Sequence, residues 1–145
     1  MVRIGGARLG VLSCHLSLAA RERDAQAGLL LERLAALGVP HAVAGGDLNE
    51  RPDGGSFRRL AGALTDAWAA RPWGGELTST PRDPHQRIDA IFTTPGVEVL
   101  GCGVPHGLPG YGRATSPPRR TICRCWPRCG CRPGLTHTTA DSLHR

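Results

Sequence analysis

The most constraining feature of this sequence is a short apolar segment that ends in two glycines and two polar side chains. Residues 41–51 read H-A-V-A-G-G-D-L-N-E-R, so Asp47 and Asn49 follow the apolar run at alternate positions. Alternate residues of an extended chain point to the same side. At the end of a buried strand, a carboxylate and an amide can together hold a metal, a water molecule and a phosphate oxygen, and glycines let backbone approach a ligand. The same pattern also starts turns, because both side chains cap backbone N–H groups.

Two further segments have strand patterns that carry polar side chains. Residues 8–17 place His15 near the end of one apolar run, and residues 86–92 place Asp89 inside another. Between the first two strands, leucines at three- and four-residue steps predict a helix from position 17 or 18 to about 37. The order of strand, long helix, strand, loops and strand predicts an α/β fold.

The segment after residue 51 predicts smaller elements. We expect a turn over 51–55, a short helix over 56–64 and a long loop over 71–85, which suits a substrate-facing rim. A turn over 94–96 followed by V-E-V-L at 97–100 predicts a hairpin with the preceding strand.

Charge divides the chain into two parts. Residues 1–112 carry eleven arginines against eleven acidic residues, whereas residues 113–145 carry seven arginines against Asp141 alone. The first part is therefore neutral, which excludes binding to nucleic acid through a generally basic surface. We interpret residues 1–112 as the folded unit and residues 113–145 as a disordered basic tail rich in Cys, Pro and Arg.

Three motifs in this order resemble the endonuclease/exonuclease/phosphatase family, which has a deoxyribonuclease-I-like fold. They are C-H-L-S with E-R-D-A-Q behind it, G-D-L-N-E, and R-I-D-A-I-F, within residues 2–101. The resemblance implies a partial two-sheet sandwich flanked by helices. It also implies that residues 1–112 are the C-terminal portion of the family domain, because the opening strands, with their own Asn and Glu, have no counterpart here.

The resemblance implies magnesium-dependent hydrolysis of a phosphoester, nucleic acid being one possible substrate. Asp47 would orient or deprotonate the attacking water, and Asn49 would hold that carboxylate and a phosphate oxygen; both are implied metal ligands. His15 would donate a hydrogen bond to the phosphate or to the leaving oxygen. Asp89 would pair with the histidine of a terminal Ser-Asp-His motif.

Arg87 and the segment 78–81 each allow two interpretations. Arg87 either bridges to Asp89 or forms a plain strand salt bridge. Residues 78–81 resemble the family's Thr-x-Pro loop, which as a rim element could touch substrate, although the segment is also typical of a simple turn.

The family's last strand, with its Ser-Asp-His motif, is missing from this reading of the sequence. The codons for residues 120–127, read in the preceding frame, permit Asp-His-Leu-Pro-Val-Leu-Ala. We therefore infer a frameshift between Gly101 and Arg120. Without that histidine and the amino-terminal Asn and Glu, we expect no measurable turnover from the chain as it stands.

The tail supports an alternative, in which the chain is a non-catalytic fragment whose basic Cys-rich tail binds nucleic acid or zinc. The Cys-x-Cys spacing is poor for a tetrahedral zinc site. The residues that could ligate zinc are Cys123, Cys125, Cys129, Cys131, His137 and His144.

The sequence contains no apolar segment near the roughly 20 residues that span a bilayer. The apolar stretch before Cys14 is interrupted by Arg3 and Arg8 and is too short for a signal peptide. We therefore expect a cytoplasmic protein, of an oligomeric state that the sequence leaves open.

Overall fold

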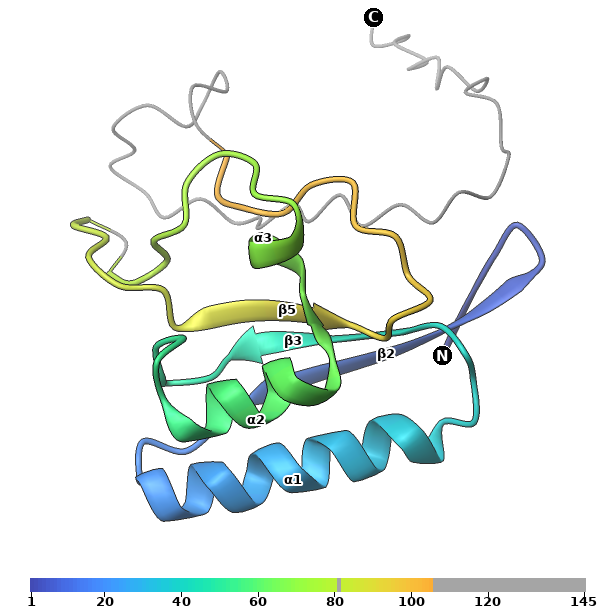
Figure 1. Ribbon diagram of the computed structural model, residues 1–145, viewed down its shortest axis with the longest axis horizontal. Helices are drawn as coiled ribbons and strands as arrows, with labels where there is room; N and C mark the ends of the chain where they lie inside the picture. The colour runs from blue at the N-terminus through green and yellow to red at the C-terminus, as the bar shows by residue number, and fades with distance from the viewer. Residues whose placement is uncertain (81, 106–145) are drawn as a thin grey trace, which may run out of the picture.

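The computed structural model describes residues 1–80 and 82–105. The predicted basic tail, its zinc-ligand candidates and the inferred frameshift products beyond residue 105 lie outside these residues. The elements run in the order β1 (Val2–Ile4), β2 (Ala7–His15), α1 (Ala20–Ala36), β3 (Ala42–Asp47), α2 (Gly55–Ala63), β4 (Thr65–Asp66), α3 (Ala67–Ala70) and β5 (Asp89–Thr93) (Figure 1).

The strands form one mixed sheet in the order β1-β2-β3-β5-β4. β2 and β3 are parallel and are joined through α1, whereas the other neighbours are antiparallel. This confirms the predicted α/β class. The second sheet of the expected sandwich is not found in the part of the chain that the structure describes, because all its named strands join this single sheet.

The hydrophobic core lies between the sheet and the helices α1 and α2, which cover one of its faces (Figure 1). Small residues of β3, Ala42 and Ala44, allow the helices to approach, and Phe92 of β5 fills the space beside Phe57 and Leu60 of α2. The Phe57 and Phe92 rings meet edge to face at 5.3 Å. Burial of each such large side chain contributes roughly 1.5–3 kcal/mol.

The helix α1 matches the predicted helix except at its start. It begins at Ala20 rather than at position 17 or 18, because the backbone of Ser17 and Leu18 is hydrogen-bonded to side chains of the helix itself. At the other end, the N–H of Gly38 reaches the carbonyl of Ala35, and the glycine adopts a φ of 60°, which ends the helix.

The predicted hairpin between β5 and residues 97–100 is wrong, although the turn before it is present. Residues 97–100 form no strand, because both edges of β5 are already occupied: Thr93 pairs with Val43 of β3 and with Thr65 of β4. The chain instead crosses to the loop after α3. There, the backbone of Cys102 exchanges hydrogen bonds with Arg71 and Trp73.

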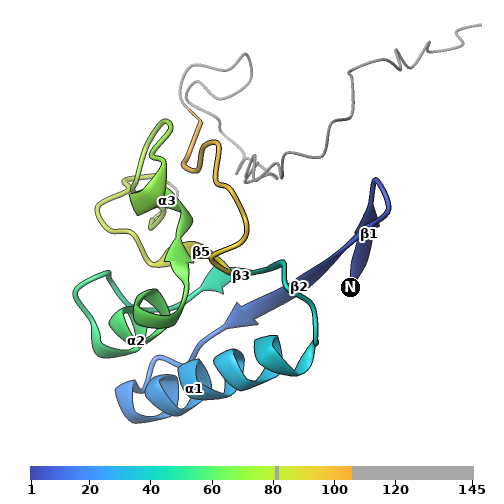
Figure 2. The same ribbon diagram turned by 45° about the vertical axis from the view of Figure 1, so that its right-hand side comes forward.

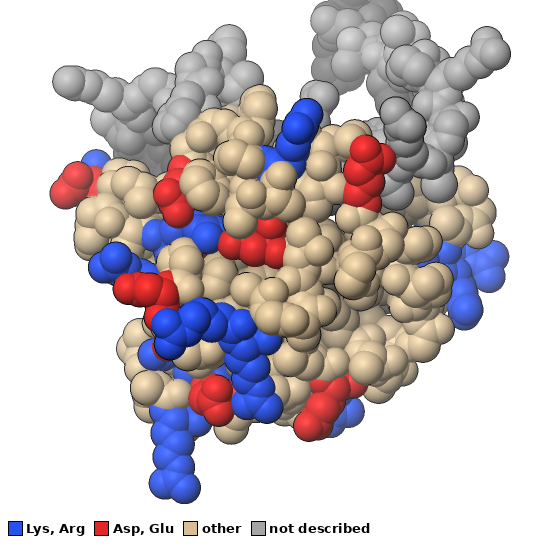
Figure 3. Space-filling view, viewed as in Figure 1, with Lys and Arg blue, Asp and Glu red and all other residues tan. Residues whose placement is uncertain are grey.

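The surface of the described region is mixed in charge. Figure 3 shows arginine and acidic side chains interspersed over the side that carries the helices. In Figure 2, β1 and the first part of β2 extend past α1 as a hairpin whose side chains are mostly exposed. Among residues 1–80 and 82–105, none of the helices has the length and hydropathy needed to cross a membrane.

Candidate active site

Three of the predicted site residues lie in one row across the sheet. His15, at the end of β2, is the register partner of Asp47 at the end of β3, and Asp47 is the partner of Asp89 at the start of β5. Register partners project to the same face of a sheet. The antiparallel direction of β5 therefore brings its first residue to the edge at which the two parallel strands end.

The two aspartates of this row are close neighbours. The N–H of Leu48 donates to the carbonyl of Ile88 at 2.8 Å, so the adjacent pair, Asp47 and Asp89, occupies a non-hydrogen-bonded position of the ladder. Side chains approach most closely at such positions, and two like charges there repel each other. A cation bound between the two carboxylates would relieve this repulsion.

The side chain of His15 lies on the other side of Asp47 from Asp89. The Nε2 atom of His15 lies 3.8 Å from Oδ2 of Asp47, which is too long for a hydrogen bond but close enough for electrostatic attraction. The His15 side chain is 74% exposed and that of Asp47 32% exposed. The imidazole is therefore open to a ligand, unlike a histidine held in the core.

Asn49 combines the two interpretations of the Asp-x-Asn pattern. Its backbone N–H donates to Oδ1 of Asp47 at 2.8 Å, which forms the predicted turn, and its φ is 49°. Its side-chain Nδ2 donates to the carbonyl of Leu16 at 2.7 Å, directly after His15. With Nδ2 directed to Leu16, Oδ1 is the amide atom that can accept a hydrogen bond or bind a cation.

The two glycines before Asp47 allow the neighbouring strands to approach β3. The sequence predicted that they let backbone approach a ligand, which stays a prediction. A Cβ atom at Gly46, whose φ is 149°, would lie 1.9 Å from the carbonyl oxygen of Cys14 on β2. At Gly45 it would lie 2.8 Å from the carbonyl oxygen of Ala90 on β5. The glycines therefore let the strands that carry His15 and Asp89 come close to β3.

Cys14 lies next to His15 and is partly buried. Burial raises the pKa of its thiol above the ordinary value of 9.0, and the negative charge of Asp47 raises this pKa further. The thiol therefore stays protonated near neutral pH and is a poor nucleophile.

Arg87 does not bridge to Asp89. Its two terminal nitrogens bind both carboxylate oxygens of Asp66, at 2.9 and 3.0 Å, and its Nε lies 3.3 Å from Glu76. Asp66 also accepts a hydrogen bond from the N–H of Trp68 and so caps α3. Asp66 was not among the predicted residues, although an aspartate directly before A-W-A-A is a helix-start signal.

Thr78 holds the start of β5. Its hydroxyl oxygen accepts hydrogen bonds from the N–H groups of Ile88 and Asp89, each at 3.2 Å. The predicted rim residue therefore fixes the backbone that carries Asp89. Pro81, at the other end of that motif, lies outside the described residues.

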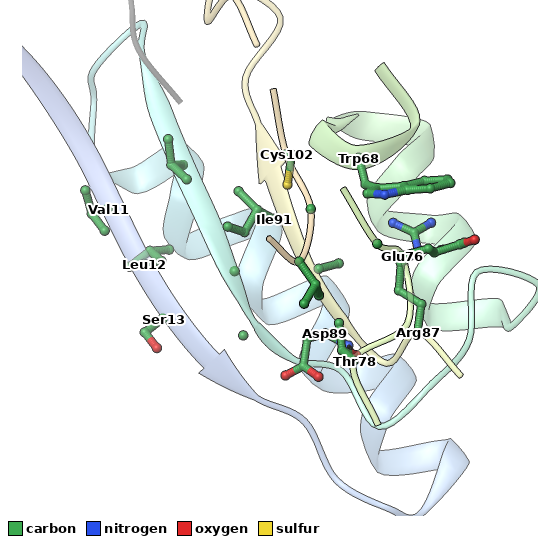
Figure 4. A pocket seen from close by; sticks show the side chains of 17 residues that line it. Val11, Leu12, Ser13, Trp68, Glu76, Thr78, Arg87, Asp89, Ile91 and Cys102 are labelled. Atoms are coloured by element: carbon green, nitrogen blue, oxygen red, sulfur yellow. Dashed lines mark hydrogen bonds and ion pairs between the residues drawn. The ribbon is translucent and has the colours of Figure 1, made fainter. Parts of the chain in front are cut away.

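An apolar pocket of about 360 Å³ lies beside the row, on the face of the sheet opposite α1 and α2. Val11, Val43 and Ile91, on three neighbouring strands, form its floor. Figure 4 shows Asp89 at one end of the pocket. The loop after α3 and the segment around Cys102 overhang the floor. The pocket therefore adjoins the polar row at Asp89, and most of its other lining residues are uncharged.

The donors at the row match the chemistry of magnesium in part. Mg²⁺ prefers oxygen ligands and is usually held by one or two carboxylates, with water and substrate phosphate completing the shell. Asp47, Asp89 and the Oδ1 atom of Asn49 are donors of this kind. Within residues 1–80 and 82–105, no group of three or more His, Cys, Asp or Glu side chains is arranged to hold a metal.

Comparisons with known proteins agree with this architecture. The sequence model of the endonuclease/exonuclease/phosphatase family matches residues 3–127. A solved family protein from Bacteroides vulgatus is 25% identical, with a TM-score of 0.58, over 66% of this chain and 41% of that one. A family protein from Bacteroides thetaiotaomicron is also 25% identical, with a TM-score of 0.56, over 64% of this chain and 38% of that one.

A mannosyl-6-phosphatase from Bacteroides thetaiotaomicron shows the same fold at 24% identity, with a TM-score of 0.56, over 64% of this chain and 39% of that one. No curated protein matches the sequence. The chain thus spans about two-fifths of the length of these solved relatives. Because the family model covers well over half of its residues, this chain belongs to the endonuclease/exonuclease/phosphatase family.

Proposed function

We propose that this chain supplies part of the active site of a divalent-metal-dependent phosphoester hydrolase. The observation that carries the proposal is the row of His15, Asp47 and Asp89 across three neighbouring strands. Membership of the family supports the general class of reaction. The phosphoester itself stays open, because the row recognises a phosphate group and nothing in it selects the rest of a substrate.

Asp47 would orient or deprotonate the attacking water through Oδ2. Its other carboxylate oxygen is fixed by the N–H of Asn49, so the side chain is held in one orientation. Magnesium bound by Asp47 and Asn49 would supply positive charge that offsets the charge of the phosphoryl group. Asn49 would contribute its Oδ1 to that ion and one amide N–H to a phosphate oxygen.

His15 would donate an imidazole N–H to the phosphate or to the leaving oxygen. Its high exposure leaves the ring accessible to a substrate, and the nearer carboxylate oxygen of Asp47 lies 3.8 Å from Nε2. Asp89 would fix the tautomer of a further histidine, supplied from outside the described residues. The row would then hold a proton donor on one side of Asp47 and a histidine-orienting carboxylate on the other.

We further propose that the chain binds magnesium weakly and turns over no substrate by itself. The assigned ligands are one carboxylate, that of Asp47, and one amide oxygen, that of Asn49, and the chain spans only about two-fifths of its solved relatives. Other groups that act on the phosphate would come from the remainder of such a domain. A chromogenic phosphodiester with Mg²⁺ should therefore show background hydrolysis only, and activity that disappears in Asp47→Ala would refute the absence of turnover.

Magnesium binding is the direct test of the site. Titration of the ¹⁵N-labelled chain with Mg²⁺ should shift the backbone amide signals of Asp47, Asn49 and Asp89, and Asp47→Asn should abolish these shifts. Asp53→Asn is the matched control, because Asp53 is 77% exposed and lies in the next turn. Shifts that persist in Asp47→Asn, or that are lost equally in Asp53→Asn, would contradict the proposed site.

A further inference from the structure

One buried arginine connects the two turns that carry the candidate site. Arg23, in the first turn of α1, is 9% exposed and touches both the turn after β2 and the turn after β3. We propose that Arg23 is a positioning residue that holds His15 and Asn49 at a fixed separation. The inference rests on the proposed function only in naming those two residues as site residues.

The turn after β2 is held through its carbonyl groups. The Nη1 atom of Arg23 donates to the carbonyl oxygens of Ser17 and Leu18, each at 3.0 Å. Gln26, one helical turn further on, accepts from the N–H of Ser17 at 2.7 Å. The chain that follows His15 is therefore fixed to α1 by hydrogen bonds on both its donors and its acceptors.

The turn after β3 is held through Glu50, the residue after Asn49. The Nε and Nη2 atoms of Arg23 bind Oε1 of Glu50 at 3.0 and 2.9 Å, and the N–H of Phe57 donates to Oε2 at 2.9 Å. The side chains of this pair are 11% and 12% exposed. A Cβ atom at Gly54 would lie 2.1 Å from Cγ of Glu50, so the turn is shaped around this side chain.

Asn49 links the two turns and has an uncommon backbone conformation. Its φ of 49° lies in the left-handed region, which asparagine adopts more readily than most residues other than glycine. Asn49 itself reaches the turn after β2, because its side-chain amide donates a hydrogen bond to the carbonyl of Leu16. A cavity of about 390 Å³ adjoins both turns, and its lining includes Leu18, Asn49, Glu50 and Ile88. Without the Arg23 bridge, we expect Asn49 to relax and to leave Leu16.

Lysine cannot replace this arginine. The guanidinium reaches three acceptors on two turns with a fixed planar fork, whereas an ammonium is a point charge on a flexible stem. Arg23→Lys therefore keeps the charge and removes the bridge. Arg59→Lys is the matched control, because Arg59 also carries an arginine-to-carboxylate pair between α1 and α2, with Asp24, but its side chain is 47% exposed.

The test compares these variants in the full chain by NMR. In the parent protein, the side-chain amide of Asn49 should show a nuclear Overhauser effect to Leu16, next to His15. Arg23→Lys should abolish that effect and weaken Mg²⁺ binding about tenfold or more, as loss of groups that orient metal ligands does. Arg59→Lys should leave both unchanged.

A purely structural role would give a different result. If Arg23→Lys lowers the melting temperature but keeps the Asn49–Leu16 effect, the positioning role is refuted. Should that variant fail to fold, Glu50→Met is read in the same way, since it keeps about the size of the side chain and removes the acceptor that Arg23 binds on the turn after β3. If the parent protein shows the effect but binds no Mg²⁺, the proposed function fails while the positioning test still stands.

Discussion

Arg87 and Asp66 form a bidentate ion pair in which both side chains are less than one-tenth exposed. The guanidinium also lies 5.0 Å from the ring of Phe57 and 5.1 Å from that of Trp68. Figure 4 shows Trp68 beside Arg87 at the edge of the pocket. The pair joins the segment before β5 to β4 and α3, and so supports the strand on which Asp89 lies.

Arg87→Met should therefore destabilise the fold strongly. Removal of one partner leaves the buried carboxylate of Asp66 without its counter-charge, which costs about 3–5 kcal/mol. Urea unfolding monitored by tryptophan fluorescence measures this change. Arg59→Met, at an exposed pair, should change the free energy of unfolding by less than about 1 kcal/mol. Equal effects of the two substitutions would contradict the role given to the buried pair.

Gly46→Ala should destabilise the protein by about 2–4 kcal/mol, because the new methyl group would collide with the backbone of Cys14 in a conformation unsuited to alanine. Gly62→Ala, in the helix α2, meets nothing within 4 Å and should instead stabilise by roughly 0.5–1 kcal/mol. Chemical denaturation of both variants tests the opposite signs. A Gly46→Ala variant as stable as the parent would show that β2 and β3 are not in close contact here.

The stability of the protein should depend on the ionisation of Glu50. Burial alone would raise its pKa, but hydrogen bonds from the N–H of Phe57 and from Arg23 outweigh burial and hold the pKa below 4.5. A lowered pKa in the folded state contributes stability that is fully present above pH 4.5 and is lost as the pH falls through the folded-state value.

The melting temperature of the parent protein should therefore fall more steeply below pH 4.5 than that of Glu50→Gln, which has no charge to lose. Thermal unfolding followed by circular dichroism across acidic pH measures both curves. Parallel curves for the two proteins would show that Glu50 has the same pKa in the folded and unfolded states.

Cys14 should react slowly with iodoacetamide at mildly alkaline pH. Burial, followed by the charge of Asp47, raises the pKa of the thiol, so little thiolate is present. Asp47→Asn removes the second cause and should accelerate alkylation, whereas Asp53→Asn should not. Peptide mass spectrometry resolves this cysteine from the others. Identical rates in the three proteins would rule out an electrostatic link between Cys14 and Asp47.

Local patterns predicted the elements that depend on neighbouring residues alone. Apolar runs gave the strands that became β2, β3 and β5, and leucine periodicity gave α1 to within about three residues, because these periodicities report which side of an element is buried. The Asp-x-Asn pattern left a turn at Asp47 and Asn49 open as one of two interpretations, and the structure contains that turn. The roles of His15, Asp47, Asn49 and Asp89 in hydrolysis remain predictions.

Only the tertiary structure decided which distant groups meet. The sequence could not show that Arg87 pairs with Asp66, 21 residues earlier, or that Arg23 reaches Glu50, 27 residues later. It also predicted a hairpin at 97–100, which the structure excludes because β4 occupies the free edge of β5. Periodicity shows which face of a strand is apolar, but strand order and register depend on which edges other segments already fill. The strand order and register that result, with β3 between β2 and β5, bring His15, Asp47 and Asp89 into one row.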